Sequence, residues 1–144
     1  MSERGRILES EEDIVAVLRN ARRIAVVGIK PASQPSAPAY YVPAYLKRAG
    51  YEIVPVPTYF PEATEMLGEP VYRSVAEIPG DIDLVIVFRR SADVPAHVDD
   101  IIAGKPRAVW MQLGIRNDDA ADRLTTAGID VVQNRCAMIE HRAA

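Results

Sequence analysis

The sequence predicts one α/β domain, built as a doubly wound parallel sheet of about five strands with helices on both faces. Two observations lead to this fold class. Short apolar runs alternate with segments of helical periodicity, at a spacing of roughly 25 residues. The 144 residues also contain no internal repeat, linker or low-complexity tract that would divide them. Residues 1–9 lie outside this pattern and are expected to be disordered.

The first half of the chain is expected to hold two helices and two strands. Residues 10–21 form a helix whose first residue, a serine, can cap it and is followed by acidic residues. The aliphatic run 24–28 is a strand buried on both faces. Apolar residues at helical spacing predict a second helix that ends at Gly50, with Pro43 either in its first turn or at a kink. Residues 51–56 form the second strand.

The middle of the chain contains the clearest buried strand. Residues 58–70 are expected to be a loop, followed by a very short strand at 71–72 and a helical turn at 75–78. The run 84–88 is continuously apolar and is predicted as a strand. Apolar residues at helical spacing over 94–102 predict the next helix.

The last third repeats the alternation once more. Residues 108–111 form a strand, and Asn117 or Asp118 caps a helix that Gly128 ends. A final strand at 129–132 leads into a short tail. This order is typical of a single Rossmann-like domain, in which right-handed helical crossovers join parallel strands.

Composition excludes several classes of protein. A net charge of −3 argues against a general nucleic-acid binder, which is usually strongly basic. One cysteine excludes an internal disulfide framework, and with two histidines a metal centre is not expected. No apolar run approaches the ~20 residues that span a bilayer, and the acidic N-terminus does not resemble a signal peptide. We therefore predict a cytoplasmic location, without membrane or nucleic-acid partners.

Candidate ligand-binding residues follow the predicted strands, because ligands of an open parallel sheet bind beyond the carboxyl ends of the strands. After the first strand, a glycine permits close approach, and the hydroxyl groups and unpaired N–H groups at the next helix start suit phosphate. The candidates there are Gly28, Ile29, Lys30, Ser33, Ser36, Pro38 and Tyr40. No G-x-G-x-x-G pattern is present, so this corner alone does not identify the nucleotide.

The end of the second strand argues against NAD. Val56 and Pro57 are apolar and could flank an adenine ring. An NAD site usually has an acidic residue at this position to hold the ribose hydroxyls, and none follows here.

The next two strand ends supply polar groups. Phe88, Arg89 and Arg90 follow the third long strand, and a guanidinium group binds two phosphate oxygens at once. Ser91 is expected to cap the following helix. Gln112, after the fourth strand, could hydrogen-bond an amide of the ligand.

No catalytic residue is predicted. A nucleophilic Cys136 needs a partner that lowers its pKa or takes its proton, and the sequence does not identify one. His141 lies near the terminus, and no Ser-His-Asp spacing or H-E-x-x-H motif is present.

Several strings together carry a family resemblance. V-F-R-R-S, W-M-Q-L-G-I and R-C-x-x-x-E-H are the most distinctive of them. The matching stretches are 24–28, 51–56, 87–94, 109–115 and 134–141. With these strings the sequence resembles the small stand-alone CoA-binding proteins, which are related to the CoA-binding domain of the succinyl-CoA synthetase α subunit.

The resemblance implies that residues 1–144 form one Rossmann-like domain that binds coenzyme A. It implies phosphates near the first loop and the helix after it, and adenine near Val56 and Pro57. It brings no catalytic residue, because the phosphorylated histidine of succinyl-CoA synthetase lies in another domain, and neither His97 nor His141 inherits that role. The residues that the resemblance assigns to the phosphate loop are Gly28, Ser33, Pro38 and Tyr40, with Phe88, Arg89 and Arg90 at the next strand end.

One position departs from the family pattern. Members that resemble this chain usually have a basic residue just before the proline that opens the second helix, and here that place is taken by Ala37. If the alignment runs through Pro35 instead, Gln34 occupies it. Lys30 is the cation that could substitute.

Four hypotheses about function remain open at this point. The leading one is a non-catalytic protein that binds coenzyme A or an acyl-CoA, with or without a protein partner. The alternative is an NAD(P)-binding sensor or redox domain, in which Arg89 or Arg90 serves a 2′-phosphate. A third is a thiol-dependent activity, in which Cys136 forms a mixed disulfide with coenzyme A. The fourth is an interaction domain without a ligand.

Overall fold

The computed structural model describes residues 3–144 and confirms the predicted fold class. Five parallel strands form one sheet in the order β2–β1–β5–β6–β7. The strands are β1 (Arg23–Val27), β2 (Glu52–Val56), β5 (Leu84–Val87), β6 (Ala108–Met111) and β7 (Asp130–Val132). Every predicted strand of this sheet is therefore present, with its ends within one residue of the expected bounds.

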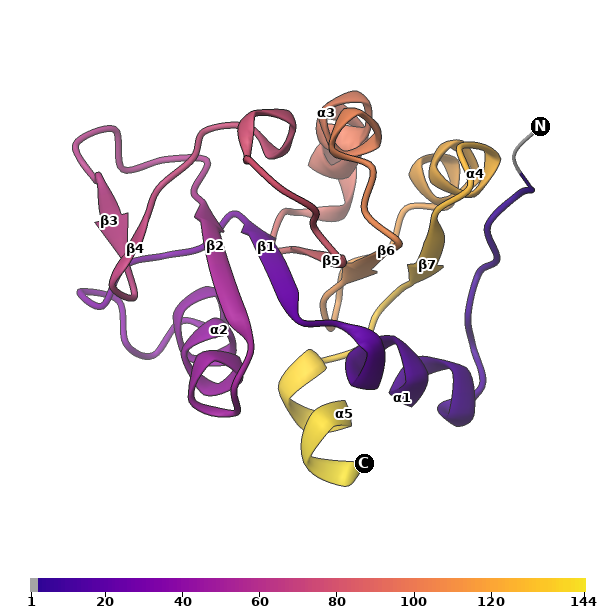
Figure 1. Ribbon diagram of the computed structural model, residues 1–144, viewed down its shortest axis with the longest axis horizontal. Coiled ribbons are helices and arrows are strands. Elements are labelled where there is room, and N and C mark those ends of the chain that lie inside the picture. Colours follow the sequence, from indigo (N-terminus) through magenta and orange to yellow (C-terminus); the bar gives the residue numbers. More distant parts are fainter. Residues whose placement is uncertain (1–2) are drawn as a thin grey trace.

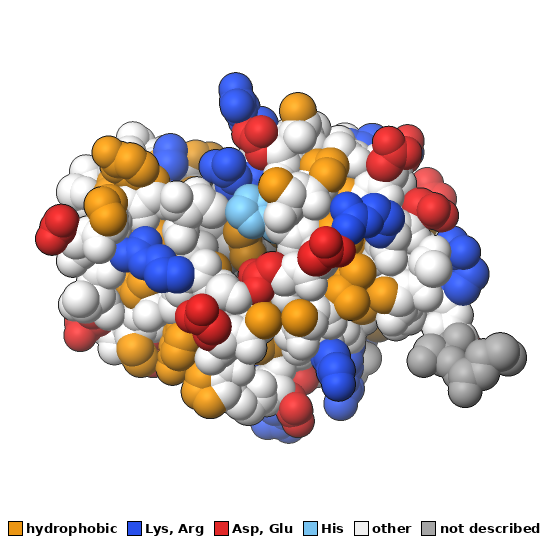
Figure 2. Space-filling model, turned by 90° about the horizontal axis from the view of Figure 1, so that it is seen from above, with side chains coloured by type: hydrophobic (Ala, Val, Ile, Leu, Met, Phe, Trp, Pro, Cys, Tyr) orange, Lys and Arg blue, Asp and Glu red, His pale blue; other side chains and the backbone are white. Residues whose placement is uncertain are grey.

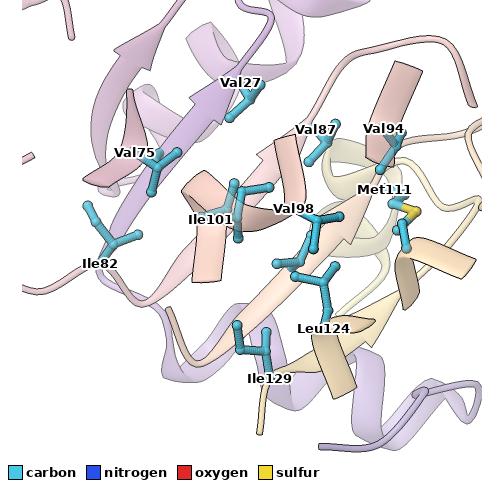
Figure 3. Close-up of a cluster of buried hydrophobic side chains, with 14 of the residues drawn as sticks. Val27, Val75, Ile82, Val87, Val94, Val98, Ile101, Met111, Leu124 and Ile129 are labelled. Carbon is cyan, nitrogen blue, oxygen red and sulfur yellow. The ribbon is translucent and has the colours of Figure 1, made fainter. Parts of the chain in front are cut away.

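Helices cover both faces of the sheet (Figure 1). One face carries α1 (Glu11–Asn20), α2 (Pro38–Arg48) and α5 (Ala137–Ala143). The other carries α3 (Val98–Gly104), α4 (Asp118–Thr126) and the 3-10 turns η1 (Val75–Glu77) and η2 (Ser91–His97). Alternate residues of each strand point to opposite faces, so the sheet separates two apolar clusters. Figure 3 shows the cluster beneath α3 and α4, where Ile101 and Leu124 pack against the strands.

The predicted helix caps are confirmed at two positions. The Ser10 hydroxyl accepts a hydrogen bond from the Asp13 N–H at 3.1 Å, and Asn117 Oδ1 accepts one from the Ala120 N–H at 2.8 Å. Asn117, rather than Asp118, is therefore the cap of α4. The prediction for Ser91 is wrong, because its hydroxyl accepts a hydrogen bond from the Arg116 N–H at 3.0 Å instead of capping η2.

The prediction of a short strand at 71–72 is wrong. A two-stranded hairpin lies earlier, inside the segment predicted as a loop, and consists of β3 (Glu65–Met66) and β4 (Glu69–Pro70). Its two turn residues, Leu67 and Gly68, both have positive φ angles, of 54° and 76°. Such a tight turn usually contains Asn or Gly at both positions, so leucine hides it from sequence patterns.

The tail after β7 is a helix, α5, rather than an irregular end. Its first N–H, at Ala137, donates to Oε1 of Gln112 at 2.8 Å, so a side chain from another loop performs the capping. Arg135 Nη1 pairs with Glu11 at 2.8 Å, and His141 Nδ1 lies 2.7 Å from the Tyr45 hydroxyl. The R-C-x-x-x-E-H string thus includes the residues that fasten α5 to α1 and α2.

The segment before α1 is ordered from residue 3 onward, contrary to the expectation of disorder for residues 1–9. Ile7 forms a parallel bridge with Val131, and the Leu8 N–H donates to the Val131 carbonyl at 2.8 Å. Leu8 is 5% exposed. This added strand-like contact covers the outer edge of β7, which would otherwise leave backbone groups unpaired. Positions 1–2 lie outside the described residues.

Pro43 lies at the sixth residue of α2, beyond the first turn. A proline has no N–H, so the carbonyl of Ala39, four residues earlier, receives no hydrogen bond from within the helix. That carbonyl accepts a hydrogen bond from the Lys30 N–H at 3.1 Å instead. This hydrogen bond, at the carbonyl that the proline leaves open, joins the loop after β1 to the first turn of α2.

The face over α3 and α4 mixes acidic, basic and apolar side chains (Figure 2). No broad surface of one charge is visible on it. Within residues 3–144, every helix is too short or too polar to cross a membrane.

Candidate functional site

The sheet has one point where the strand order changes direction, between β1 and β5. Connections leave these neighbouring strands toward opposite sides, which opens a crevice at their carboxyl ends. A cavity of about 620 Å³ lies there. Its wall is formed by Gly28, Lys30, Ala37, Pro38, Ala39, Tyr41, Thr58, Phe88, Arg89, Arg90, Gln112, Leu113, Ile115, Cys136, Met138 and Ile139.

Gly28 forms the floor of this crevice where the backbone of β1 meets that of β5. Its N–H donates to the Val56 carbonyl at 2.9 Å, and the Phe88 N–H donates to the Val27 carbonyl at 2.8 Å. Gly28 has a φ of +84°, and a Cβ built on it would come closer than 3.0 Å to the Phe88 carbonyl oxygen. Both the backbone conformation and the close approach therefore require glycine.

The first turn of α2 contributes one unpaired backbone donor to the cavity wall. The residue before it, Ala37, has no side chain that could cap the helix. The Ala39 N–H has no hydrogen-bond partner in the described part of the chain. Lys30, an exposed cation, lines the same wall as Ala37 and Pro38. Lys30, the cation that could substitute for a basic residue at position 37, therefore lies on the same cavity wall as Ala37.

Arg89 is held by three neighbours. Its Nε donates to Nε2 of His97 at 3.2 Å, its Nη1 donates to the Thr58 hydroxyl at 3.3 Å, and its Nη2 lies 3.7 Å from Asp93. Arg90 is far more exposed, with 86% of its side chain in solvent, and pairs with Asp93 at 2.9 Å. The cavity thus has one positioned guanidinium and one at its rim.

His97 accepts the hydrogen bond from Arg89 because its imidazole is neutral. Burial lowers the pKa of His97 below its ordinary value of 6.5, and the positive charge of Arg89 lowers this pKa further. Asp100 and Asp93 act in the opposite direction and are outweighed. A neutral ring with a free Nε2 lone pair is the form that can orient Arg89.

We expect His97 to make the fold less stable in mild acid. The unfolded chain protonates His97 near pH 6.5, whereas the folded chain does so only at lower pH, so the unfolded state binds more protons in that window. The free energy of unfolding should therefore fall as the pH drops from 6.5 through the folded-state pKa. Urea unfolding at about pH 7.5 and about pH 5.5 measures this dependence.

The comparison variant is His97→Gln, whose amide oxygen can still accept from Arg89 but does not titrate. Its stability should depend less on pH than that of the wild-type protein. Equal pH dependence in the two proteins would show that His97 contributes nothing to it.

The side of the cavity formed by α5 and the loop after β6 is apolar. Two large apolar side chains of this side remain exposed, namely Leu113 at 63% and Ile139 at 51%, and Tyr41 of α2, which lines the same cavity, is 37% exposed. Exposed apolar side chains gathered at one cavity mouth are typical of a binding site.

Seven of the predicted binding residues lie together in this cavity. They are Gly28, Lys30, Pro38, Phe88, Arg89, Arg90 and Gln112. Others lie outside its wall: the Ile29 side chain is buried in the core beneath α1 and α2, and Ser33 and Ser36 are exposed in the loop. Tyr40 also lies outside the wall. Residues three apart share a helix face, so Tyr41 lies on the same side of α2 as Pro38 and faces the cavity in place of Tyr40.

Val56 and Pro57 are buried and line a second, smaller cavity of about 350 Å³. Arg73, His97 and Asp100 complete that wall together with Val27 and Thr58. Thr58 lines both cavities, so the two adjoin at the end of β2.

Sequence reasoning missed the contribution of α5. Cys136, Met138 and Ile139 line the cavity, although they follow the last strand by several residues. The wall they form depends on the hydrogen bond between Gln112 and Ala137, a contact between segments 25 residues apart. Tyr41 carried a usable signal, since its spacing from Pro38 predicts a shared helix face. Within residues 3–144, no group of three or more His, Cys, Asp or Glu side chains could hold a metal ion.

A comparison with protein families matches most of the chain. Residues 22–142 match a family model described as a CoA binding domain. The uncharacterized protein YneT of Bacillus subtilis is 34% identical over 132 residues, which cover 92% of this chain and 94% of that protein.

Solved structures agree with the fold. A hypothetical protein from Pyrococcus horikoshii OT3 superposes with a TM-score of 0.86 at 34% identity, over 99% of this chain and 98% of that one. A Thermus thermophilus protein superposes with a TM-score of 0.84 at 36% identity, over 94% of this chain and 98% of that one. A dinucleotide forming acetyl-coenzyme A synthetase of Ca. Korarchaeum cryptofilum shares the fold, with a TM-score of 0.66 and 20% identity. This match covers 81% of the present chain and 27% of the synthetase.

Proposed function

The chain belongs to the CoA-binding domain family, and from that premise we propose that it binds coenzyme A, free or as an acyl-CoA, without catalysing a reaction of its own. The observation that carries the proposal is the mixed wall of the cavity between β1 and β5. Hydrogen-bond donors and cations form one part of this wall, and apolar side chains form the other. Coenzyme A has the same division, with phosphates at one end and a long, weakly polar pantetheine arm at the other.

The diphosphate is assigned to the first turn of α2. A helix start offers unpaired N–H groups and the positive end of the helix dipole, and here the Ala39 N–H is available. Lys30 and Arg89 line the same cavity and supply positive charge. The rim position of Arg90 fits a more exposed phosphate group.

The adenine is assigned to the smaller cavity beside Val56 and Pro57. This cavity adjoins the larger one at Thr58, so a ligand that crosses the end of β2 can occupy both. Arg89 donates to Thr58 at that junction, which supports a phosphate or ribose oxygen near the same guanidinium.

The pantetheine arm is assigned to the wall formed by Leu113, Met138 and Ile139. The exposed apolar surface of these residues would be removed from water by an alkyl or acyl chain. No group of the cavity forms a nucleophile–base pair, such as a Cys hydrogen-bonded to a His, within the described residues. A cytoplasmic location and a protein partner of this chain remain predictions.

The competing hypothesis is an NAD(P) site. Arg89 at the end of the crevice could bind a 2′-phosphate, which keeps NADPH as the alternative to be tested. The residues after β2, Pro57 and Thr58, lack the carboxylate that a ribose with free hydroxyls usually engages.

Calorimetric titration with coenzyme A, beside NADH, NADPH and ATP, tests the proposal. We expect micromolar binding of coenzyme A and weaker or no binding of the other three. Tighter binding of NADPH, with coenzyme A failing to displace it, would favour the alternative. No heat and no displacement with any of them would contradict a nucleotide-binding function.

A further inference from the structure

Gln112 is a buried side chain with an unused hydrogen-bond donor. It is 3% exposed, and its Oε1 accepts from the Ala137 N–H at 2.8 Å. An N–H donor can pair only with the amide oxygen, so this contact fixes the orientation of the side-chain amide. Within residues 3–144, the Nε2 group has no protein partner.

The donor of Gln112 faces the cavity. No side-chain polar atom in the described part of the chain is both fully buried and unpaired, so Nε2 must retain contact with solvent. Gln112 lines the cavity, which is the open space beside it. A nearly buried amide donor of this kind is most stable when an acceptor pairs with it. The pantetheine arm of coenzyme A contains two amide carbonyls that can serve as that acceptor.

Cys136 lies beside this amide. It precedes Ala137, the residue hydrogen-bonded to Gln112, and its 9% exposed side chain lines the same cavity. Cys136 occupies the cap position of α5 but makes no side-chain capping bond. Gln112 performs that function instead, so the thiol has no role in capping the helix.

Resting on the proposed function, we propose that Cys136 forms a reversible mixed disulfide with coenzyme A in this cavity, while Gln112 Nε2 donates to a pantetheine carbonyl. The chain contains one cysteine, so its thiol cannot be oxidised to a disulfide within the molecule. A thiol-bearing ligand bound beside it is then the natural disulfide partner.

The oxidant in this reaction is the disulfide of coenzyme A. The Cys136 thiol loses its proton to solvent, and its sulfur attacks one sulfur of the reagent. The sulfur–sulfur bond of the reagent breaks as the protein–CoA bond forms. The second coenzyme A leaves as a thiolate and takes up a proton. An external thiol reverses the reaction by the same exchange.

Binding, rather than an activated thiol, should drive this reaction. The neighbouring guanidinium of Arg135 is paired with Glu11 at 2.8 Å and lies 3.6 Å from Glu140, so two carboxylates offset its positive charge. The advantage of coenzyme A over other disulfides then comes from its concentration beside Cys136 when bound. This predicts selectivity for the CoA disulfide, not general reactivity.

The test is intact-protein mass spectrometry after reaction of the reduced protein with CoA disulfide. We expect one CoA adduct on the wild-type protein, none on Cys136→Ser, and loss of the adduct on treatment with dithiothreitol. The adduct should form roughly tenfold or more faster with CoA disulfide than with glutathione disulfide. Gln112→Glu keeps an oxygen for the Ala137 N–H but removes the donor, and should slow the CoA reaction by a larger factor than the glutathione reaction, which only the new negative charge affects.

The outcomes separate this inference from the proposed function. Calorimetry of the reduced wild-type protein with coenzyme A is run in parallel. Binding without any adduct, or equal rates with the two disulfides, would overturn the mixed disulfide and leave the binding function intact. Absence of binding would overturn both.

Discussion

Replacing Gly28 with alanine is expected to destabilise the fold by roughly 2–4 kcal/mol, more than any other single-methyl addition in the loops around the cavity. Gly28 has a φ of +84°, which a residue with a Cβ adopts only with strain. The added methyl would also overlap the carbonyl oxygen of Phe88. The backbone cannot move aside easily, because hydrogen bonds hold Gly28 to Val56 and Phe88 to Val27.

Gly114→Ala is the matched control for this substitution. Gly114 has almost the same φ, +85°, and lies in the loop after β6, but no neighbouring atom lies within 4 Å of the point that an alanine methyl would occupy. The Gly114→Ala variant should therefore lose only the free energy of unfolding that backbone strain costs, about 1–2 kcal/mol. The free energies of unfolding of both variants, measured with urea, give the cost of the close approach as their difference. Equal losses in the two variants would show that β1 and β5 can separate at no cost.

Replacing Arg89 with alanine is expected to weaken the binding of coenzyme A by about 1.5–3 kcal/mol, which corresponds to roughly 10- to 150-fold in Kd. Arg89 is the guanidinium that the structure holds at the junction of the two cavities, through His97 and Thr58. A side chain that is already oriented loses little freedom when it binds a phosphate. Arg89→Lys keeps the charge but not the planar fork, and should fall between alanine and the wild-type protein.

Arg123→Ala serves as the charge control. Arg123 pairs with Asp99 between α3 and α4 and does not line either cavity. Its loss changes the net charge by the same amount, so calorimetry should show little change in the Kd for coenzyme A. A similar loss in both variants would mean that Arg89 acts only through long-range charge. Melting temperatures of the variants separate weaker binding from loss of folded protein.

The sheet was predictable because its strands are buried on both faces. Such strands are continuous aliphatic runs, and the run at 84–88 admits no helical alternative of that length. The helix caps at Ser10 and Asn117 were also predictable, since they depend on residues three positions away. Local chemistry therefore decides most of this fold.

The features that could not be predicted depend on distant contacts. The hairpin turn places Leu67 at a positive φ, which the residue itself disfavours. Helix α5 follows a cysteine that does not cap it, and its capping group comes from Gln112, before the last crossover. Ser91 would suit a helix cap, but the backbone N–H of Arg116 occupies its hydroxyl.

The candidate site likewise contains some residues that could be predicted from the sequence and others that could not. The rule that ligands bind beyond the carboxyl ends of parallel strands was enough to select Gly28, Arg89 and Gln112. It does not select the wall supplied by α5, because Met138 and Ile139 reach the cavity only after that helix folds back. Nor does it say which loop residues turn outward, as Ser33 and Ser36 do.

The carbonyl that Pro43 leaves open in α2 determines when the loop after β1 loses its conformational entropy. Fixing the backbone of one residue costs roughly 1–2 kcal/mol, and the hydrogen bond from Lys30 to Ala39 imposes that cost during folding. A ligand that arrives at the start of α2 meets a loop already held at Lys30. Little of the free energy of the ligand's contacts with this loop and the start of α2 is then offset by ordering the chain, so more of it contributes to affinity.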